Sequence, residues 1–204
     1  MTKLKRITSR QCLFVGLIAL LGACSSDTPA ITATVPEGNK DEQQLLALVK
    51  KLYQWHTADP NPTDFEPIAD AKDSLYIGID RIKHLNRVEI LQKTGFFNDE
   101  FIAGYNKISG AIDQGLKDTS LIWAVGDLPT FGNESDPWCL CQDEPENNFW
   151  QNITLQNLEI KDDNASFQWV WNNTLKYKVK AVRENDTWRI SELEGFVFKT
   201  YMGK

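Results

Sequence analysis

The chain has 204 residues, with 28 acidic and 22 basic side chains, a formal net charge of −6 and 42% hydrophobic residues. This length and apolar content suit one globular domain with a substantial core. The acidic balance argues against nucleic acid as a partner, because phosphate contacts need clustered Lys and Arg.

Residues 1–23 have the layout of an export signal. A basic start without acidic residues precedes the apolar run 12–21, which is shorter than the roughly 20 residues of a membrane-spanning helix. The run Leu21-Gly22-Ala23-Cys24 resembles the lipobox of bacterial lipoprotein signal peptides. The resemblance implies cleavage before Cys24 and acylation of its thiol and of its new amino group. An ordinary secretory signal with a chance cysteine is the alternative.

Lipid on Cys24 would hold the domain on a membrane, because two acyl chains bind stably where one binds marginally. Cleavage removes four of the 22 basic residues and none of the 28 acidic ones, which leaves a net charge of −10. A basic protein surface is therefore not expected to contribute to membrane attachment. Ser25 stands where an aspartate would imply retention at the inner membrane, so we predict attachment to the outer membrane, facing the periplasm. Residues 24–40, rich in Ser, Thr and Pro, are predicted to be a flexible tether to a single domain, residues 41–204.

The first part of this domain has helical periodicity. Helices are predicted over 42–56 and over 74–92, with Gly95 as an end cap for the second. Asn98 is predicted to cap a third helix. The apolar side of the second helix would comprise Ile79, Ile82, Leu85 and Val88, and that of the third Phe101, Tyr105, Ile108, Ile112 and Leu116.

From Ile153 the apolar period changes to two, which indicates strands separated by polar turns at 162–164, 172–173 and 184–186. A change of phase predicts a β-bulge near Gln156 and Asn157. We therefore predict an α+β fold, in which N-terminal helices pack on a curved, cone-like antiparallel meander of about four strands. A row of lysines is expected on its solvent face: Lys176, Lys178 and Lys180.

This order of elements, ending in the run from Lys176 to Ile190, resembles the nuclear-transport-factor-type cone fold of ketosteroid isomerases and SnoaL-like proteins over about residues 41–200. The run Asp136-Pro137-Trp138, followed by Gln142-Asp143, is similar to a loop in a domain-of-unknown-function family of uncharacterised bacterial lipoproteins and periplasmic proteins. These resemblances imply a fold and no particular activity.

After the predicted cleavage, Cys139 and Cys141 are the only cysteines left besides Cys24 and form a candidate disulfide, although a Cys-x-Cys ring is tight. A redox role or a thiolate metal site is the more specific interpretation, but zinc sites need more ligands than this motif supplies. The surrounding loop, residues 126–148, is acidic. It lacks the spacing of a calcium-binding loop, which favours a solvated acidic surface and predicts no metal.

Other candidate site residues lie on helices and strands. His56 and His84 are the only histidines, and the end of a helix would favour the charged form of His56. Glu192, in phase with Trp188 and Ile190, is the one carboxylate expected to point inward. A set of aromatic side chains would line a pocket or simply fill the core: Phe167, Trp169, Tyr177 and Trp188.

No established catalytic motif is present, so the sequence favours a non-enzymatic binding module without a cofactor. Its partner would be another protein, as in an immunity protein that blocks a toxin, or a small apolar ligand. The alternative is a cone-fold enzyme that acts on a small apolar substrate, with Glu192 or His56 as base. That enzyme requires a closed cavity of about 300 Å³ or more. A metal-handling protein that uses Cys139 and Cys141 is a third hypothesis.

Overall fold

The computed structural model describes residues 37–59, 63–72, 74–129, 131–132, 135–143, 145–146 and 148–203. The predicted signal peptide, the lipid-attachment residue Cys24 and most of the predicted tether lie outside these ranges. The described residues belong to one compact unit. Among them, no helix combines the length and the apolar character needed to cross a membrane.

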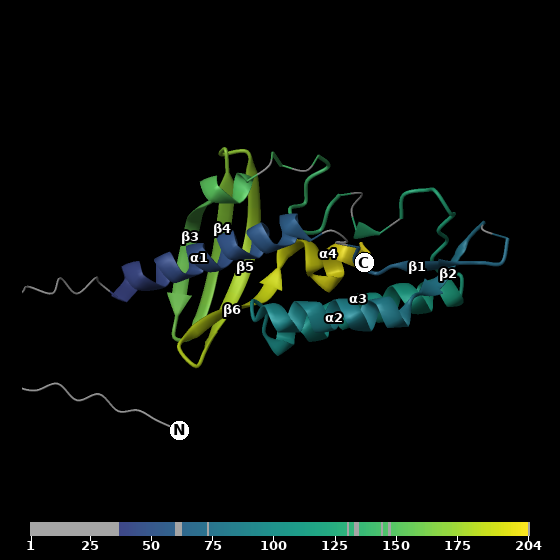
Figure 1. Cartoon of the computed structure of the whole chain (residues 1–204), viewed down its shortest axis with the longest axis horizontal. Helices are drawn as coiled ribbons and strands as arrows, with labels where there is room; N and C mark the ends of the chain where they lie inside the picture. Colours follow the sequence, from purple (N-terminus) through teal and green to yellow (C-terminus); the bar gives the residue numbers. More distant parts are fainter. Residues whose placement is uncertain are drawn as a thin grey trace, which may run out of the picture. The chain divides into compact units, whose positions relative to one another are not determined.

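Helices come first and a four-stranded antiparallel sheet follows, as predicted (Figure 1). Figure 1 shows α1 crossing the sheet and α2 lying beside α3. In chain order the elements are α1 (Glu37–Ala58), β1 (Pro67–Ala69), β2 (Tyr76–Ile79), α2 (Arg81–Thr94), α3 (Asp99–Lys117), η2 (Phe149–Asn152), β3 (Thr154–Lys161), β4 (Asn164–Trp171), β5 (Leu175–Glu184), β6 (Thr187–Leu193), η3 (Glu194–Phe196) and α4 (Phe198–Met202).

The sheet confirms the predicted meander, with strand order β3-β4-β5-β6. Its register shifts between Gln156 and Glu159, where the sequence predicted a bulge. The turns carry Asn or Asp at positive φ, the conformation that tight hairpins require and that these residues tolerate. The sheet is not closed into a barrel, so the structure shows the α+β meander and leaves the cone resemblance as an expectation.

Helix α1 begins at Glu37, so residues 37–40 belong to the helix and not to the predicted tether. Its apolar side is buried against η2, β3 and β6. Asp41, near its start, is also buried, and it accepts hydrogen bonds from Arg183 Nη2 at 2.6 Å and Trp188 Nε1 at 3.2 Å. The N-terminal end of α1 is thereby fixed to β5 and β6.

The predicted helix over 74–92 is wrong in its first third, because residues 76–79 form strand β2 and pair with β1. The helix starts only after Asp80, whose carboxylate accepts from the backbone N–H groups of Ile82 and Lys83. Of the predicted apolar side, Ile79 and Val88 are buried, but Ile82 is 73% and Leu85 is 58% exposed, so half of the prediction is wrong. Besides Val88, helix α2 buries Arg87 and Leu91.

The third helix confirms its prediction. The Asn98 side chain accepts a hydrogen bond from Phe101 N, and Gly95 ends α2 in the left-handed conformation. The whole predicted apolar face of α3 is buried. The segment between the two helices joins the sheet through hydrogen bonds of Phe96 and Asn98 with Ile190.

The inner face of the sheet is filled with side chains. Trp169, Tyr177, Ile190 and Leu193 are fully buried there. Glu192 does not join them, because the register shifts between Lys180 and Ala181, and Glu192 pairs with Lys180 on the opposite strand. Its carboxylate makes an ion pair with Lys180 at 2.9 Å on the exposed face. The prediction of an inward Glu192 is therefore wrong.

Candidate functional site

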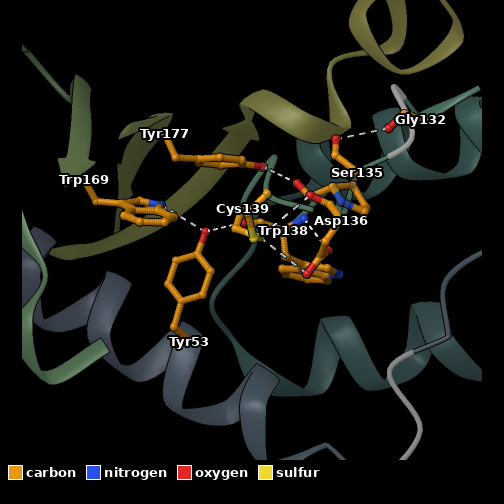
Figure 2. The surroundings of a disulfide bond; sticks show 10 residues. Tyr53, Gly132, Ser135, Asp136, Trp138, Cys139, Trp169 and Tyr177 are labelled. Atoms are coloured by element: carbon orange, nitrogen blue, oxygen red, sulfur yellow. Dashed lines mark hydrogen bonds between the residues drawn. A yellow bond between two sulfur atoms is a disulfide. The ribbon is translucent and has the colours of Figure 1, made fainter. Parts of the chain in front are cut away.

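The acidic loop contains a tight turn, residues 136–141, that carries both cysteines (Figure 2). Asp136 N–H donates to the Cys141 carbonyl at 3.0 Å, and Leu140 N–H donates to the Asp136 carbonyl at 2.7 Å. Leu140 adopts a positive φ of 53°, which lets the chain reverse within so few residues. A disulfide joins Cys139 to Cys141, whose Cα atoms lie 5.2 Å apart.

Two buried tyrosines hold this turn on the domain. Tyr53, from α1, donates its hydroxyl to the Trp138 carbonyl at 2.6 Å and accepts from Trp169 Nε1 at 3.0 Å. Tyr177, from β5, donates to the Pro137 carbonyl at 2.7 Å. Burial raises the pKa of both hydroxyls well above the ordinary value, so both remain donors at any physiological pH. Figure 2 shows Tyr53 and Tyr177 approaching the turn from different elements.

Gly195 allows the turn to come this close to the end of the sheet. A Cβ at this position would lie 1.9 Å from the Pro137 carbonyl oxygen, which is far inside van der Waals contact. The Gly195 N–H also donates to the Tyr177 hydroxyl at 2.8 Å. The loop backbone, Tyr177 and Gly195 therefore form one connected unit.

A buried ionic cluster lies behind the turn. The Asp64 carboxylate accepts from Arg87 Nε at 3.0 Å, from the Tyr105 hydroxyl at 2.7 Å and from Trp138 Nε1 at 2.7 Å. Arg87 also makes an ion pair with Asp59 at 2.5 Å. Burial alone would lower the pKa of Arg87, but Asp64 and Asp59 outweigh it and raise the pKa. Two carboxylates thus share one guanidinium, which leaves the cluster with a formal negative charge.

His56 lies against the turn and is neutral at physiological pH. Its ring stacks on Trp138, with 4.4 Å between ring centroids and 23° between planes. Burial lowers its pKa from 6.5 to about 4, although nearby Asp64 acts in the opposite direction. The expectation that the helix end would favour the charged form is therefore wrong, because desolvation dominates. Nδ1 of His56 is buried without a hydrogen-bond partner among the described residues.

A cavity of about 170 Å³ opens between the end of α1, the turn and η2. Carboxylates, aromatic rings and a neutral histidine contribute to its wall. No Lys or Arg is among these described lining residues, which are Tyr53, His56, Thr57, Asp59, Asp136, Trp138, Cys139, Pro145, Glu146 and Phe149.

Of the candidate site residues that were predicted from the sequence and that the structure describes, His56 and Cys139 line this cavity and the others do not. The candidate pocket residues Phe167, Trp169 and Tyr177 are buried core residues, and this cavity is lined by others. Trp188 is also buried, although it borders a separate shallow depression near Phe96. His84 lies elsewhere, within 2.8 Å of the Asn106 side-chain oxygen.

Asp136, Cys139 and Cys141 place a carboxylate oxygen and both sulfur atoms within 4.8 Å of one another. Such a group has suitable atoms for a soft metal ion. Thiolates are the metal-binding form of cysteine, however, and a disulfide contains none. This arrangement therefore offers a metal no sulfur ligand unless the bridge is reduced.

Sequence reasoning missed Tyr53, Asp64 and Arg87. The apolar run Trp138-Cys139-Leu140 inside an otherwise acidic loop was the available signal that this segment folds against the core. Nothing in the sequence paired it with Asp64 or Arg87, which are far away along the chain.

Comparisons with protein-family models, curated proteins and solved structures each found no match. The fold and the site define an α+β domain with an acidic, aromatic-lined cavity beside a Cys-x-Cys disulfide. Its function is accordingly argued from its own residues.

Proposed function

We propose that this chain is a lipid-anchored binding module of the bacterial envelope, whose cavity takes a small, positively charged organic ligand. The observation that carries the proposal is the composition of the cavity wall. Asp59, Asp136 and Glu146 contribute carboxylates, and Tyr53, Trp138 and Phe149 contribute aromatic rings. Carboxylates and aromatic rings together are the groups that recognise ammonium ions.

The electrostatics around the cavity support a cation. Among the described lining residues His56 is the one basic side chain, and burial lowers its pKa to about 4, so it carries no charge at neutral pH. Arg87 lies behind Asp59, but it is shared with Asp64, so the cluster remains negative. A negative field within a partly enclosed wall attracts cations more strongly than an open surface does.

The size of the cavity limits the ligand. A volume of about 170 Å³ is smaller than the 300 Å³ or more that is usual for drug-sized molecules. The carboxylates in the wall make the small apolar ligand predicted from the sequence a poor fit, because those charges would lose hydration without gaining a partner. A compact amine or quaternary ammonium group fits both constraints.

The cone-fold enzyme is less well supported. It requires a cavity inside the sheet, with Glu192 or His56 as base. The inner sheet face is packed, and Glu192 points to the opposite side. His56 does face a cavity, but this cavity lies outside the sheet, between α1 and the acidic loop.

Calorimetric titration of the purified protein with tetramethylammonium tests the cation proposal. We expect saturable binding that weakens with added salt, and at least about tenfold weaker binding of the neutral analogue tert-butanol. Glu146→Gln should weaken tetramethylammonium binding about three- to tenfold, whereas the matched surface change Glu159→Gln on β3 should not alter it. Equal affinity for the charged and neutral probes, or no binding of either, would refute the proposal.

The membrane anchor is a separate part of this proposal and rests on the Leu21-Gly22-Ala23-Cys24 motif. Mass spectrometry of the protein isolated from bacterial envelopes should find an acylated Cys24 at the new N-terminus. Cys24→Ser should release the protein from the membrane fraction. An unmodified Cys24 in the wild-type protein would remove this part and leave the ligand proposal standing.

A further inference from the structure

Neither the proposed cation binding nor the ionic cluster explains why Cys139 and Cys141 form a disulfide. The entropic stabilisation by a disulfide grows with the length of the loop that it closes. This bridge encloses a single residue, Leu140, so it constrains the unfolded chain very little. The turn is held independently by the hydroxyl groups of Tyr53 and Tyr177 and by its own backbone hydrogen bonds. A purely structural purpose is therefore a weak explanation for this bridge.

The two sulfur atoms have different surroundings. Cys139 is buried, whereas Cys141 is half-buried. The Asp136 carboxylate oxygen Oδ2 lies 3.6 Å from Cys139 Sγ. Thus Cys141 is the more exposed of the two cysteines, and Cys139 has a carboxylate oxygen near its sulfur atom.

We propose that Cys139 and Cys141 form a thiol–disulfide exchange site that oxidises dithiols. In the first step a substrate thiolate attacks Cys141 Sγ, the Cys139–Cys141 bond breaks, and its electron pair leaves on Cys139. A proton from solvent reaches that thiolate through Asp136. This step produces a mixed disulfide between the substrate and Cys141, and a Cys139 thiol.

In the second step the other thiolate of the substrate attacks the substrate sulfur of the mixed disulfide. A substrate disulfide forms, and Cys141 leaves as a thiolate that takes a proton from solvent. The substrate has lost two electrons and two protons, and the chain has become the dithiol. In the reverse direction Asp136 accepts the Cys139 proton as that sulfur attacks Cys141. Asp136 is therefore the proton donor and acceptor of the exchange.

The site can change redox state without losing the turn. The backbone groups of residues 137 and 138 bind the two tyrosines and do not depend on the bridge. The hydrogen bond from Gly195 N–H to the Tyr177 hydroxyl does not involve either cysteine. We therefore expect the loop framework to hold Cys141 in the same position before and after exchange.

The test uses the full chain in detergent with Cys12→Ser and Cys24→Ser, so that the two loop cysteines are the only ones left, and compares Cys139→Ser with Cys141→Ser in that background. We expect the remaining thiol of Cys139→Ser, at residue 141, to form a mixed disulfide with glutathione disulfide at least about tenfold faster than the thiol left in Cys141→Ser. Mass spectrometry after acid quenching measures both rates. Equal rates, or faster reaction of residue 139, would overturn the assignment of the two sulfurs.

Reduction of the wild-type protein by dithiothreitol supplies a second measurement. The folded protein should be reduced without unfolding, and its thermal midpoint should shift by only a few degrees. Asp136→Asn should slow re-formation of the bridge about tenfold near neutral pH and change its pH profile, whereas Asp127→Asn, an acid elsewhere in the loop, should change neither. A bridge that is reduced only on unfolding would refute the proposal. Tetramethylammonium titration of the same preparation shows separately whether the cation proposal holds.

Discussion

The sheet and the acidic loop are ordered in different ways. Strands β4 to β6 bury apolar side chains in a largely alternating pattern, and each hairpin of the sheet is closed by its own local turn residues. The turn at 136–141 is instead held by groups from distant parts of the chain: the hydroxyls of Tyr53 and Tyr177, which donate to its carbonyls, and the Asp64 carboxylate, which accepts from its Trp138 indole. Apolar burial is spread over many contacts, whereas the position of the loop depends on a few polar bonds. Single substitutions should therefore distinguish the two regions.

Arg87→Met should have the largest effect, because it removes the cation that two buried carboxylates share. Breaking a buried ion pair typically costs about 3–5 kcal/mol in the free energy of unfolding. Arg87 and Asp64 are only 6% and 7% exposed, so solvent cannot replace the lost partner. Urea unfolding at neutral pH measures the change.

Lys93→Met is the matched control for this change. Lys93 pairs with Glu89 on the exposed side of the same helix, where solvent screens the ion pair and its loss should hardly change the free energy of unfolding. If both substitutions cost the same, the buried cluster does not hold α2 and the loop together.

Gly195→Ala should destabilise the protein by about 3 kcal/mol, which is the upper part of the range for forced overpacking. The added methyl group would collide with the Pro137 carbonyl, a backbone atom that the Tyr177 bond holds in place. Gly110→Ala on α3 is the control, because its Cβ would meet open space and alanine favours helices. If Gly195→Ala leaves the free energy of unfolding unchanged, the loop can move away from the sheet without destabilising the protein.

Tyr177→Phe should cost about 2 kcal/mol in the free energy of unfolding, since it leaves a partly buried carbonyl of residue 137 and a buried N–H of residue 195 without their partner. Native-state hydrogen exchange followed by NMR should show faster exchange in residues 138–141 and little change in the central strands β4 and β5. Equal acceleration in loop and sheet would mean that the two regions open as one unit.

The sequence predicted the sheet well for a physical reason. Its strands alternate with a period of two, and its bulge and turns depend on residues adjacent in the chain, such as Asn157 and Asn172. The α3 helix was predictable in the same way from Asn98 and its apolar spacing.

Failures arose where a distant partner overrides the local pattern. Helix α2 turns Arg87 inward toward Asp64, so its aliphatic residues Ile82 and Leu85 face solvent. The candidate site was predictable only in part. Cys139, Cys141 and His56 stood out as residue types, but the pairing of Trp138 with Asp64 and Tyr53 depends on contacts between residues 74 and 85 positions apart.

The smallest predicted effect concerns the pH dependence contributed by His56. Its pKa is about 4 in the folded protein and 6.5 when unperturbed, so the unfolded chain takes up this proton first as the pH falls. Stability should therefore decrease by about 1 kcal/mol between pH 7.5 and 5.5 through this residue alone. Urea unfolding at both pH values should show that His56→Gln loses this part of the pH dependence, whereas His84→Gln retains it. If the stability of both variants depends on pH in the same way, the His56 ring that stacks on Trp138 is hydrated in solution. The cavity beside it would then already admit water or ions next to His56.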